Sequence, residues 1–504
     1  MRKSGILLHI ASLPNDYGIG SMGREAYDFV DYLKKSGQSI WQILPLSQTS
    51  YGDSPYQSFS IYAGNPYFIS LDVLAEEGLL KKSEYENIKW CEDPRYIDYA
   101  TMYEQFYKVM KHAYRRFSSQ KNGNVSGEYR AFLDDNKWLH DYALFMALKD
   151  AHGGKAWSEW EKPLRLREPS AVKSAEKKCE AEMDFYIFLQ FKFFQQWHKL
   201  KKYANDNGIE IIGDIPIYVS PDCADVWAQP ELFELDEKRV PKRVAGVPPD
   251  YFSADGQLWG NPLYNWPYHK QTGYAWWVRR VRHALGIYDL LRIDHFRGFD
   301  TYWAIPAGSS TARTGKWENG PGMELFDALE AALGKLPIIA EDLGELFPSV
   351  RKLLADSTFP GMKVLQFAFS GGDSEYLPHN HVKNSVVYPG THDNTPLTDW
   401  WVNAAPAKEK ANAAAYLHLT PCKPTAKEVA AVRTDAARIA LLRAALGSVA
   451  DRAIIPMYDW LGLGAEAHLN TPGKLGGNWA WRARAGFDSK ALAAQIEAEC
   501  AVYC

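Results

Sequence analysis

Eight short runs rich in Ile, Leu and Val are spaced along the chain, and most of them end in polar or charged residues. Continuous apolar runs of this length are typical of strands that are buried on both faces, as in a parallel sheet. The pattern predicts strands within residues 5–14, 39–46, 209–219, 288–296, 336–344, 361–369, 385–393 and 452–460.

Helical patterns separate several of the predicted strands. Apolar side chains in residues 24–35 recur with the 3.6-residue period of an amphipathic helix. Thr425 followed by Glu428 is a capping-box signature, and it predicts a helix that ends before Gly447. Strands that alternate with helices predict an α/β fold, and eight of them favour a (β/α)8 TIM barrel. A doubly wound open sheet is the alternative.

Two connections are much longer than a simple crossover requires. The second and third strands are joined by a long segment with helical patterns at residues 99–117 and 185–203, which predicts a mainly helical subdomain inserted at about residues 66–165. Residues 220–285 are rich in Trp, Tyr, Pro and Gly, and they predict an irregular lobe over the barrel mouth. We therefore expect residues 1–504 to form a single catalytic barrel with these additions and without a separate C-terminal β-domain.

The composition indicates which kinds of binding partner are compatible with this chain. The chain has 504 residues, 57 Lys and Arg against 61 Asp and Glu, and 46% apolar residues. This near-neutral charge argues against a nucleic acid or an anionic membrane as the main partner. The sequence has no run of 18 apolar residues, so it predicts no transmembrane helix. The aromatic share of 14%, with 18 Trp, is unusual. Aromatic rings stack on the apolar faces of sugars, although they also fill protein cores.

The six cysteines show no C-x-x-C spacing. A disulfide scaffold is typical of small secreted domains and does not suit a chain of this size. We therefore expect reduced thiols and a cytoplasmic location.

Two short motifs suggest sites that we do not expect to form. Residues 18–23 match G-x-G-x-x-G, but no acidic residue follows about 20 positions later, so a tight strand-to-helix turn is the preferred interpretation over a dinucleotide site. His379 and His381 flank Asn380 without a nearby third ligand, which favours a surface loop over a metal site. The sequence thus predicts neither a cofactor nor a metal.

Charged and polar side chains gather where predicted strands end, and in a barrel these ends form the active face. They are Asp214, Arg292, Asp294, His295, Glu341, Asp342, His392, Asp393, Asn394 and Asp459. Any one of these acids could simply cap a helix or pair with a barrel arginine. Together they suit glycosidic bond chemistry, in which one carboxylate attacks the anomeric carbon and one carboxylic acid protonates the leaving oxygen.

Arg292 stands two residues before Asp294, so both side chains point to one face of the strand. We expect the guanidinium to keep Asp294 ionised, as a nucleophile must be. The alternative is a buried Arg–Asp pair that only fills the barrel.

Long sequence motifs, in a consistent order along nearly the whole chain, indicate a resemblance to one protein family. They are SYGDSPYQSFS (50–60), AGNPYF (63–68), GDIPIYV (213–219), VAGVPPDYFSADGQLWGNPLY (244–264), LRIDHFRG (291–298), AEDLG (340–344), FPGMKVLQFAF (359–369), GTHDN (390–394) and GNWAWR (477–482). The chain resembles the 4-α-glucanotransferases of the amylomaltase (disproportionating enzyme) type, glycoside hydrolase family 77.

The resemblance implies a bacterial-type cytoplasmic (β/α)8 enzyme without a metal or organic cofactor. It implies retaining transfer between α-1,4-glucans such as maltooligosaccharides, glycogen or starch, with glucose as a further acceptor. Asp294 falls on the nucleophile, Glu341 on the general acid/base and Asp393 on the transition-state stabiliser. The implied substrate-binding residues are Arg292, His392, Ser58, Tyr62, Asp214, Asp250, Tyr251, Phe252, Gln257, Trp259 and Asn470.

The chain departs from the family pattern at Thr395-Pro396 and at residues 345–348, which bears on loop shape and substrate preference rather than on the three acids. Two other functions remain open at this stage. An α-1,4-glucan hydrolase would use the same acids with a wetter acceptor side, and a glucan-binding protein would lack turnover. The aromatic-rich residues 244–264 favour transfer, because aromatic acceptor subsites and a closing loop would exclude water.

Overall fold

The computed structural model describes residues 2–49, 52–121, 127–249, 254–344, 346–474 and 476–503. All eight predicted strands form, and they pair in parallel in the order β10-β11-β12-β1-β2-β3-β6-β9. Their bounds are β1 Lys3–Leu7, β2 Ile40–Gln42, β3 Glu210–Pro216, β6 Leu290–Asp294, β9 Ile338–Ala340, β10 Gly361–Val364, β11 Ser385–Tyr388 and β12 Arg452–Pro456. The backbone N–H of Ala340 donates to Pro360 O at 3.0 Å, which brings the two ends of the sheet together. The predicted (β/α)8 TIM barrel is confirmed, and the open sheet is excluded.

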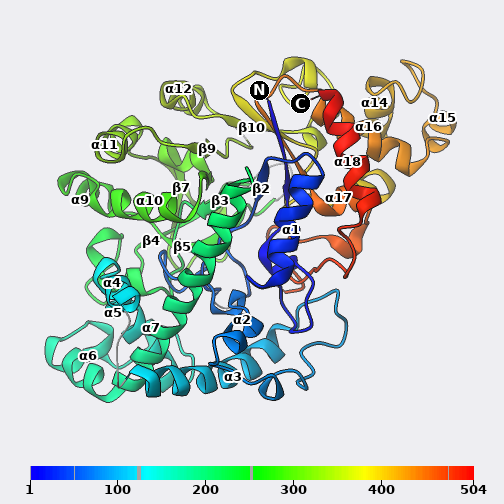
Figure 1. Ribbon diagram of the computed structural model, residues 1–504. Coiled ribbons are helices and arrows are strands. Elements are labelled where there is room, and N and C mark those ends of the chain that lie inside the picture. The colour runs from blue at the N-terminus through cyan, green and yellow to red at the C-terminus, as the bar shows by residue number, and fades with distance from the viewer. Residues whose placement is uncertain are drawn as a thin grey trace.

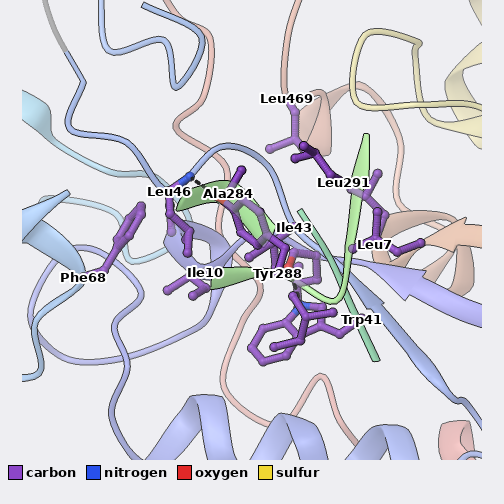
Figure 2. Close-up of a cluster of buried hydrophobic side chains, with 14 of the residues drawn as sticks. Leu7, Ile10, Trp41, Ile43, Leu46, Phe68, Ala284, Tyr288, Leu291 and Leu469 are labelled. Atoms are coloured by element: carbon purple, nitrogen blue, oxygen red, sulfur yellow. Dashed lines mark hydrogen bonds between the residues drawn. The ribbon is translucent and has the colours of Figure 1, made fainter. Parts of the chain in front are cut away.

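The barrel strands are buried because their side chains face either the barrel interior or the surrounding helices. Every residue of β2 and β10 is buried, as expected for apolar runs in a parallel sheet. Gly213 in β3 is required by close packing, since a Cβ there would lie 2.1 Å from the ring of Tyr288. The Tyr288 hydroxyl in turn accepts a hydrogen bond from Leu46 N at 3.2 Å, within the apolar cluster that Figure 2 shows.

Helices surround the barrel, with the N-terminal α1 and the long α7 among them (Figure 1). The helices that follow or precede barrel strands are α1 Arg24–Lys35, α7 Pro169–Asp206, α10 Ala275–Ile287, α11 Met323–Leu333, α12 Pro348–Ser357, α16 Thr434–Leu446 and α18 Lys490–Tyr503. The connection from β10 to β11 contains only short 3-10 turns, at Leu365–Phe367 and Pro378–Asn380. One of the seven connections between barrel strands therefore lacks an α-helix.

The long connection from β2 to β3 is mainly helical. Its helices are α2 Leu71–Glu76, α3 Tyr99–Lys121, α4 Gly127–Asp135, α5 Leu139–Ala151, α6 Lys162–Arg165 and then α7. Both helical segments expected here lie within α3 and α7. Helices α2, α3, α4 and α6 lie together in the lower part of Figure 1.

The aromatic-rich segment after β3 is more regular than the sequence suggested. It contains α8 Ala224–Ala228 and α9 Trp266–Gln271, and its strands β4 (Arg243–Val247) and β5 (Gln257–Pro262) join an antiparallel sheet. The sheet has the order β5-β4-β7-β8, with β7 at Thr301–Pro306 and β8 at Lys316–Asn319. Strand pairing in this sheet thus joins the segment after β3 to residues that follow β6.

The C-terminal part contains one clear departure from the predicted helices. The capping box of Thr425 and Glu428 forms, but it opens the short α15 (Ala426–Ala430), and a separate α16 continues to Leu446. One predicted helix is therefore two. The remaining elements are α13 Leu397–Asp399, a π-helical turn at Trp400–Ala404, α14 Ala407–Tyr416 and α17 Met457–Leu461. Helices α14 and α15 lie at the upper right edge of Figure 1.

The G-x-G-x-x-G segment is a tight turn before α1, as preferred from the sequence. Gly18 has a φ of +80°, and a Cβ on Gly20 would lie 1.8 Å from Ile10 O, so both positions require glycine. None of the helices in the described ranges combines the length and the apolar character that crossing a bilayer requires.

Candidate active site

The barrel register places four charged side chains on neighbouring strand ends. Asp214 of β3 pairs with Arg292 of β6, and Ile293 of β6 pairs with Ala340 of β9, which directly precedes Glu341. Asp294 is the last residue of β6. The carboxyl ends of parallel barrel strands form one face, so these residues meet at the mouth of the barrel.

Arg292 lies between two acids. One guanidinium nitrogen is 2.5 Å from Asp214 Oδ2 and another is 3.1 Å from Asp294 Oδ1. Arg292 and Asp214 are almost completely buried, whereas the side chain of Asp294 is 30% exposed. Asp294 is therefore the member of this cluster that a ligand in the mouth can reach.

The charge of Arg292 acts on Asp294 in the expected direction but is not the largest influence. Burial raises the pKa of Asp294, and the guanidinium of Arg292 only opposes this rise. Burial also raises the pKa of Asp214 to about 7, again against the lowering effect of Arg292. Arg292 thus favours the ionised form of Asp294, as expected, while burial acts against it, because removing a carboxylate from water disfavours its charge.

Glu341 follows β9 and is held by the backbone. His295 N donates to Oε2 at 2.7 Å, and Leu343 N donates to Oε1 at 2.8 Å. Burial first, and then the negative charge of Asp294, raises the pKa of Glu341 to about 8, although both N–H groups oppose the rise. Asp294 and Glu341 thus form a coupled pair in which Glu341 retains a proton near neutrality.

The third acid, Asp393, lies in the loop after β11. Asn470 Nδ2 donates to Asp393 Oδ1 at 2.6 Å, and His392 Nε2 lies 3.5 Å from Asp393 Oδ2. The Asp393 side chain is 38% exposed, while His392 is buried. Burial lowers the pKa of His392, which favours a neutral imidazole beside Asp393.

Tyr56, which is not among the residues predicted from the sequence, connects the two halves of this cluster. Its hydroxyl donates to Asp214 Oδ2 at 2.9 Å and lies 2.8 Å from His392 Nε2. Its ring stacks on His392 with centroids 5.4 Å apart and also lies beside Trp479. Tyr56 belongs to the motif SYGDSPYQSFS, whose resemblance to the family was the one indication that Tyr56 has a role. No local sequence pattern shows that this loop reaches the strand ends.

Aromatic side chains flank the Glu341 side of the mouth. Trp259 of β5 contacts His295 edge-on, with centroids 4.8 Å apart, and its Nε1 donates to Gln257 Oε1 at 3.1 Å. Phe367, just after β10, is 38% exposed and packs edge-on against Tyr376. The predicted residues Asp250, Tyr251 and Phe252 lie outside the described residues.

Two predicted substrate-binding residues make their contacts away from the three acids. Ser58 Oγ donates to Ser60 O at 2.9 Å, and the Ser58 side chain is buried. Tyr62 is also buried, with its ring stacked on Trp138 and edge-on to His283 of α10. Tyr62 therefore packs in the layer between the barrel and its helices.

The remaining strand-end acids have structural contacts. Asp342 is buried and accepts a hydrogen bond from Met362 N at 2.6 Å, which links the loop after β9 to β10. Asp459 is 1% exposed and lies in α17 rather than in the mouth. For these two acids, the interpretation as helix or loop anchors is the correct one.

The described residues contain no group of three or more His, Cys, Asp or Glu arranged to hold a metal ion. The His379 and His381 pair lies in a 3-10 turn and its C-terminal flank, and each imidazole has a protein partner. His381 is buried and bonds Ser448 Oγ at 2.7 Å, so the expectation of a surface loop is corrected for this residue.

Comparisons with known proteins agree with this geometry. A family model described as 4-alpha-glucanotransferase matches residues 8–488. The 4-alpha-glucanotransferase of Clostridium butyricum is 45% identical over 491 residues, covering 97% of this chain and 98% of that protein. The enzyme of the same name from Thermus thermophilus is 46% identical over 505 residues, covering 99% and 98%. The solved amylomaltase from Streptococcus agalactiae, in complex with acarbose, superposes with a TM-score of 0.94 at 43% identity and covers 100% of this chain and 99% of its own.

Proposed function

The chain belongs to the 4-alpha-glucanotransferase family, and from this premise we propose how its mouth residues transfer a segment of an α-1,4-glucan. The acceptor is the 4-hydroxyl of glucose or of another α-1,4-glucan. The observation that carries the proposal is the pairing of a reachable Asp294, next to Arg292, with a Glu341 whose pKa is raised to about 8. These are the properties that a nucleophile and a general acid require.

In the first step, an Asp294 carboxylate oxygen attacks C1 of the donor sugar. The bond from C1 to the glycosidic oxygen breaks, and the proton of Glu341 moves to that oxygen as the leaving glucan departs. Glu341 accepts two backbone N–H bonds in this structure. A protonated carboxyl has one O–H donor and still accepts hydrogen bonds, so the two backbone N–H groups can hold Glu341 while its O–H donates to the glycosidic oxygen.

In the second step, ionised Glu341 takes the proton of the acceptor 4-hydroxyl. The acceptor oxygen attacks C1, and the ester bond between C1 and Asp294 breaks. Two displacements at C1 restore the α configuration, which is the retaining outcome. Glu341 thus serves as acid and then as base, consistent with microscopic reversibility.

Asp393 stabilises the positively charged transition state in this proposal. Its orientation is supported by Asn470, which donates to Oδ1 at 2.6 Å and leaves Oδ2 directed toward His392. Asp214, Arg292, Tyr56 and His392 form one hydrogen-bonded group around the donor sugar site. Buried polar networks of this kind preorganise a site, because their members have little freedom to reorient.

We assign the acceptor side to the lobe that follows β3. Trp259 lies on that side because it contacts His295, whose backbone binds Glu341. Gln257 is hydrogen-bonded to Trp259, so we assign it to the acceptor side as well. We propose the same role for Asp250, Tyr251 and Phe252, because they lie shortly before Gln257 in the sequence. An aromatic acceptor site favours sugar over water, since it positions the incoming hydroxyl and excludes solvent.

The same proposal divides the chain 1–504 into one catalytic barrel with two additions. Residues of about 66–165 form an inserted helical subdomain, and those of about 220–285 form the active-site lobe. The division is supported by the run of helices from α2 to α6 and by the strands β4 and β5, which carry Gln257 and Trp259. We also propose a cytoplasmic location, in keeping with the free thiols of Cys91, Cys179, Cys223 and Cys422.

The S. agalactiae amylomaltase was solved with acarbose, and we propose that acarbose and maltooligosaccharides bind this chain in the same mouth. Hydrolysis of α-1,4-glucans is the second candidate, because water could replace the acceptor with the same acids. The contact between Trp259 and His295 favours transfer, since it places an apolar ring beside the residue whose backbone binds the acid/base.

Incubation with purified maltotriose tests the proposal and separates the two candidates. Products are resolved by chain length while total reducing ends are quantified. A ladder of longer maltodextrins plus glucose, with constant reducing ends, is the result expected for transfer. Shorter sugars with rising reducing ends would instead establish hydrolysis, and no product with either short or long donors would contradict both.

A further inference from the structure

The geometry points to Asp459 as a positioning residue for Asp393, because its buried carboxylate fixes one end of the loop that carries His392 and Asp393. This inference rests on the role proposed above for Asp393. Asp459 lies at the carboxyl side of β12 but is only 1% exposed, so it does not touch a sugar in the mouth. Any effect of Asp459 on catalysis must therefore act through the residues that Asp459 contacts.

The Asp459 carboxylate has one specific partner. Oδ1 accepts a hydrogen bond from Leu397 N at 2.7 Å, and Oδ2 is buried without a hydrogen-bond partner among the described residues. Burial raises the pKa of Asp459 to about 7. A half-satisfied buried carboxyl is unfavourable compared with an apolar side chain of similar size, so core packing alone does not account for an acid here.

Leu397 ends the segment that we call the Asp393 loop, residues 391–397. The other end of the loop is held by the neighbour of Asp459, since the Tyr458 hydroxyl donates to Thr391 O at 3.0 Å in a buried position. Two consecutive residues of α17 thus hold the two ends of the loop. Helix α17 is itself fixed by Arg438 of α16, which donates to Asp459 O at 2.9 Å.

Bonds within the Asp393 loop transmit this anchoring to Asp393. Asn394 Oδ1 accepts from both the N–H and the hydroxyl of Thr391 at 2.9 Å, and Gln366 Nε2 donates to Thr395 O at 2.8 Å. With both ends and the turn fixed, the backbone of Asp393 has one position. Loss of the anchor at Leu397 frees the side of the loop that follows Asp393, and a displacement of about 1 Å at a reacting group can cost about 100-fold in rate.

Two substitutions at one position test the inference. Asp459→Asn keeps an oxygen that can accept from Leu397 N, whereas Asp459→Leu fills similar space without an acceptor. For maltotriose disproportionation, we expect D459L to lower kcat by about 10- to 100-fold, with KM within about twofold of wild type, because Asp393 acts in the transition state. D459N should keep kcat within about threefold of wild type, which is rescue by the conservative variant.

A matched control at the opposite end of the barrel separates positioning from stability. Asp289 Oδ2 accepts from Ile211 N at 2.8 Å, just before β6 begins. Asp289→Leu removes this bond and the contacts of Asp289 with Asn205 and Lys201, all at the amino ends of the strands, so it should lower the thermal unfolding midpoint and leave kcat unchanged. All variants are assayed below their unfolding transitions, as followed by circular dichroism.

The outcomes distinguish this inference from the proposed function. Asp393→Asn, assayed in parallel, should lose turnover, and an active D393N would overturn the role of Asp393 itself. An inactive D393N together with a D459L kcat within twofold of wild type would overturn the positioning inference alone. So would a D459N variant as slow as D459L. If D459L does not fold, Asp459→Ala removes the same acceptor without adding bulk, and a kcat within twofold of wild type in that variant would overturn the inference.

Discussion

The titration of Glu341 should set the upper pH limit of turnover, and its magnitude follows from the environment of the carboxyl. Burial and the charge of Asp294 raise the pKa of Glu341 from 4.5 to about 8. At pH 7, roughly 90% of Glu341 is then protonated, against roughly 0.3% for a carboxyl at its ordinary pKa. The structure thus increases the acid form near neutrality by about 300-fold.

The assay is the initial rate of glucose release from maltotriose between pH 5 and pH 10, at constant ionic strength. The profile of kcat/KM reports the free enzyme. We expect a falling limb with a midpoint near pH 8, beyond which kcat/KM drops about tenfold per pH unit. A midpoint near pH 5, with the enzyme shown to remain folded, would refute the argument that burial keeps the acid protonated.

Stability gives an independent measure of the same group. Between pH 4.5 and about 8, the folded chain keeps a proton on Glu341 that the unfolded chain has released. The contribution of Glu341 to the free energy of unfolding is therefore fully present below pH 4.5 and falls by about 1.4 kcal/mol per pH unit as the pH rises toward 8. Glu341→Gln should lack this slope in denaturant unfolding measured at several pH values, and equal slopes in both proteins would contradict the assigned pKa.

Three further substitutions address other parts of the site. Tyr56→Phe removes the hydroxyl that links Asp214 to His392, while Asp214 Oδ2 keeps its bond from Arg292. The imidazole beside Asp393 loses this support, so kcat/KM for maltotriose should fall about 10-fold or more. An unchanged value would remove Tyr56 from the site. Trp259→Ala should raise the share of hydrolysis, seen as reducing ends that increase with time, whereas constant reducing ends would exclude Trp259 from acceptor selection. Asp294→Asn should abolish turnover while maltotriose still binds in calorimetry, and near-wild-type turnover would exclude it as nucleophile.

The barrel could be predicted because its strands are continuous apolar runs, each of which appears in the structure. Arg292 and Asp294 could be placed together from the period of a strand, and the register confirms that both face the same side. Pairing that depends on distant segments could not be predicted. Strand β4 pairs with β7, which follows β6, and nothing local in residues 220–285 indicates that partner.

The strand pattern indicated that acidic residues gather at one face of the barrel, but it did not indicate which residues contact them. The position of Asp459 after β12 does not reveal whether its side chain points into the mouth or behind it, and the structure places it behind, against Leu397. Tyr56 could not be recognised because its role arises from a loop that returns to His392 across the mouth. Such choices depend on packing between loops, which sequence periodicity does not describe.

The central claim is that Asp294 forms a bond with the donor sugar, and trapping that bond tests it most directly. Glu341→Gln is incubated with α-maltotriosyl fluoride, whose leaving group needs no acid, and acid-quenched protein is digested for mass spectrometry. Without the base, the second step is slow and the intermediate accumulates. We expect a maltotriosyl group on the peptide that contains Asp294, mapped to that carboxyl. Fluoride release without an adduct and with an inverted β-maltotriose product, or an adduct on a different residue, would contradict it.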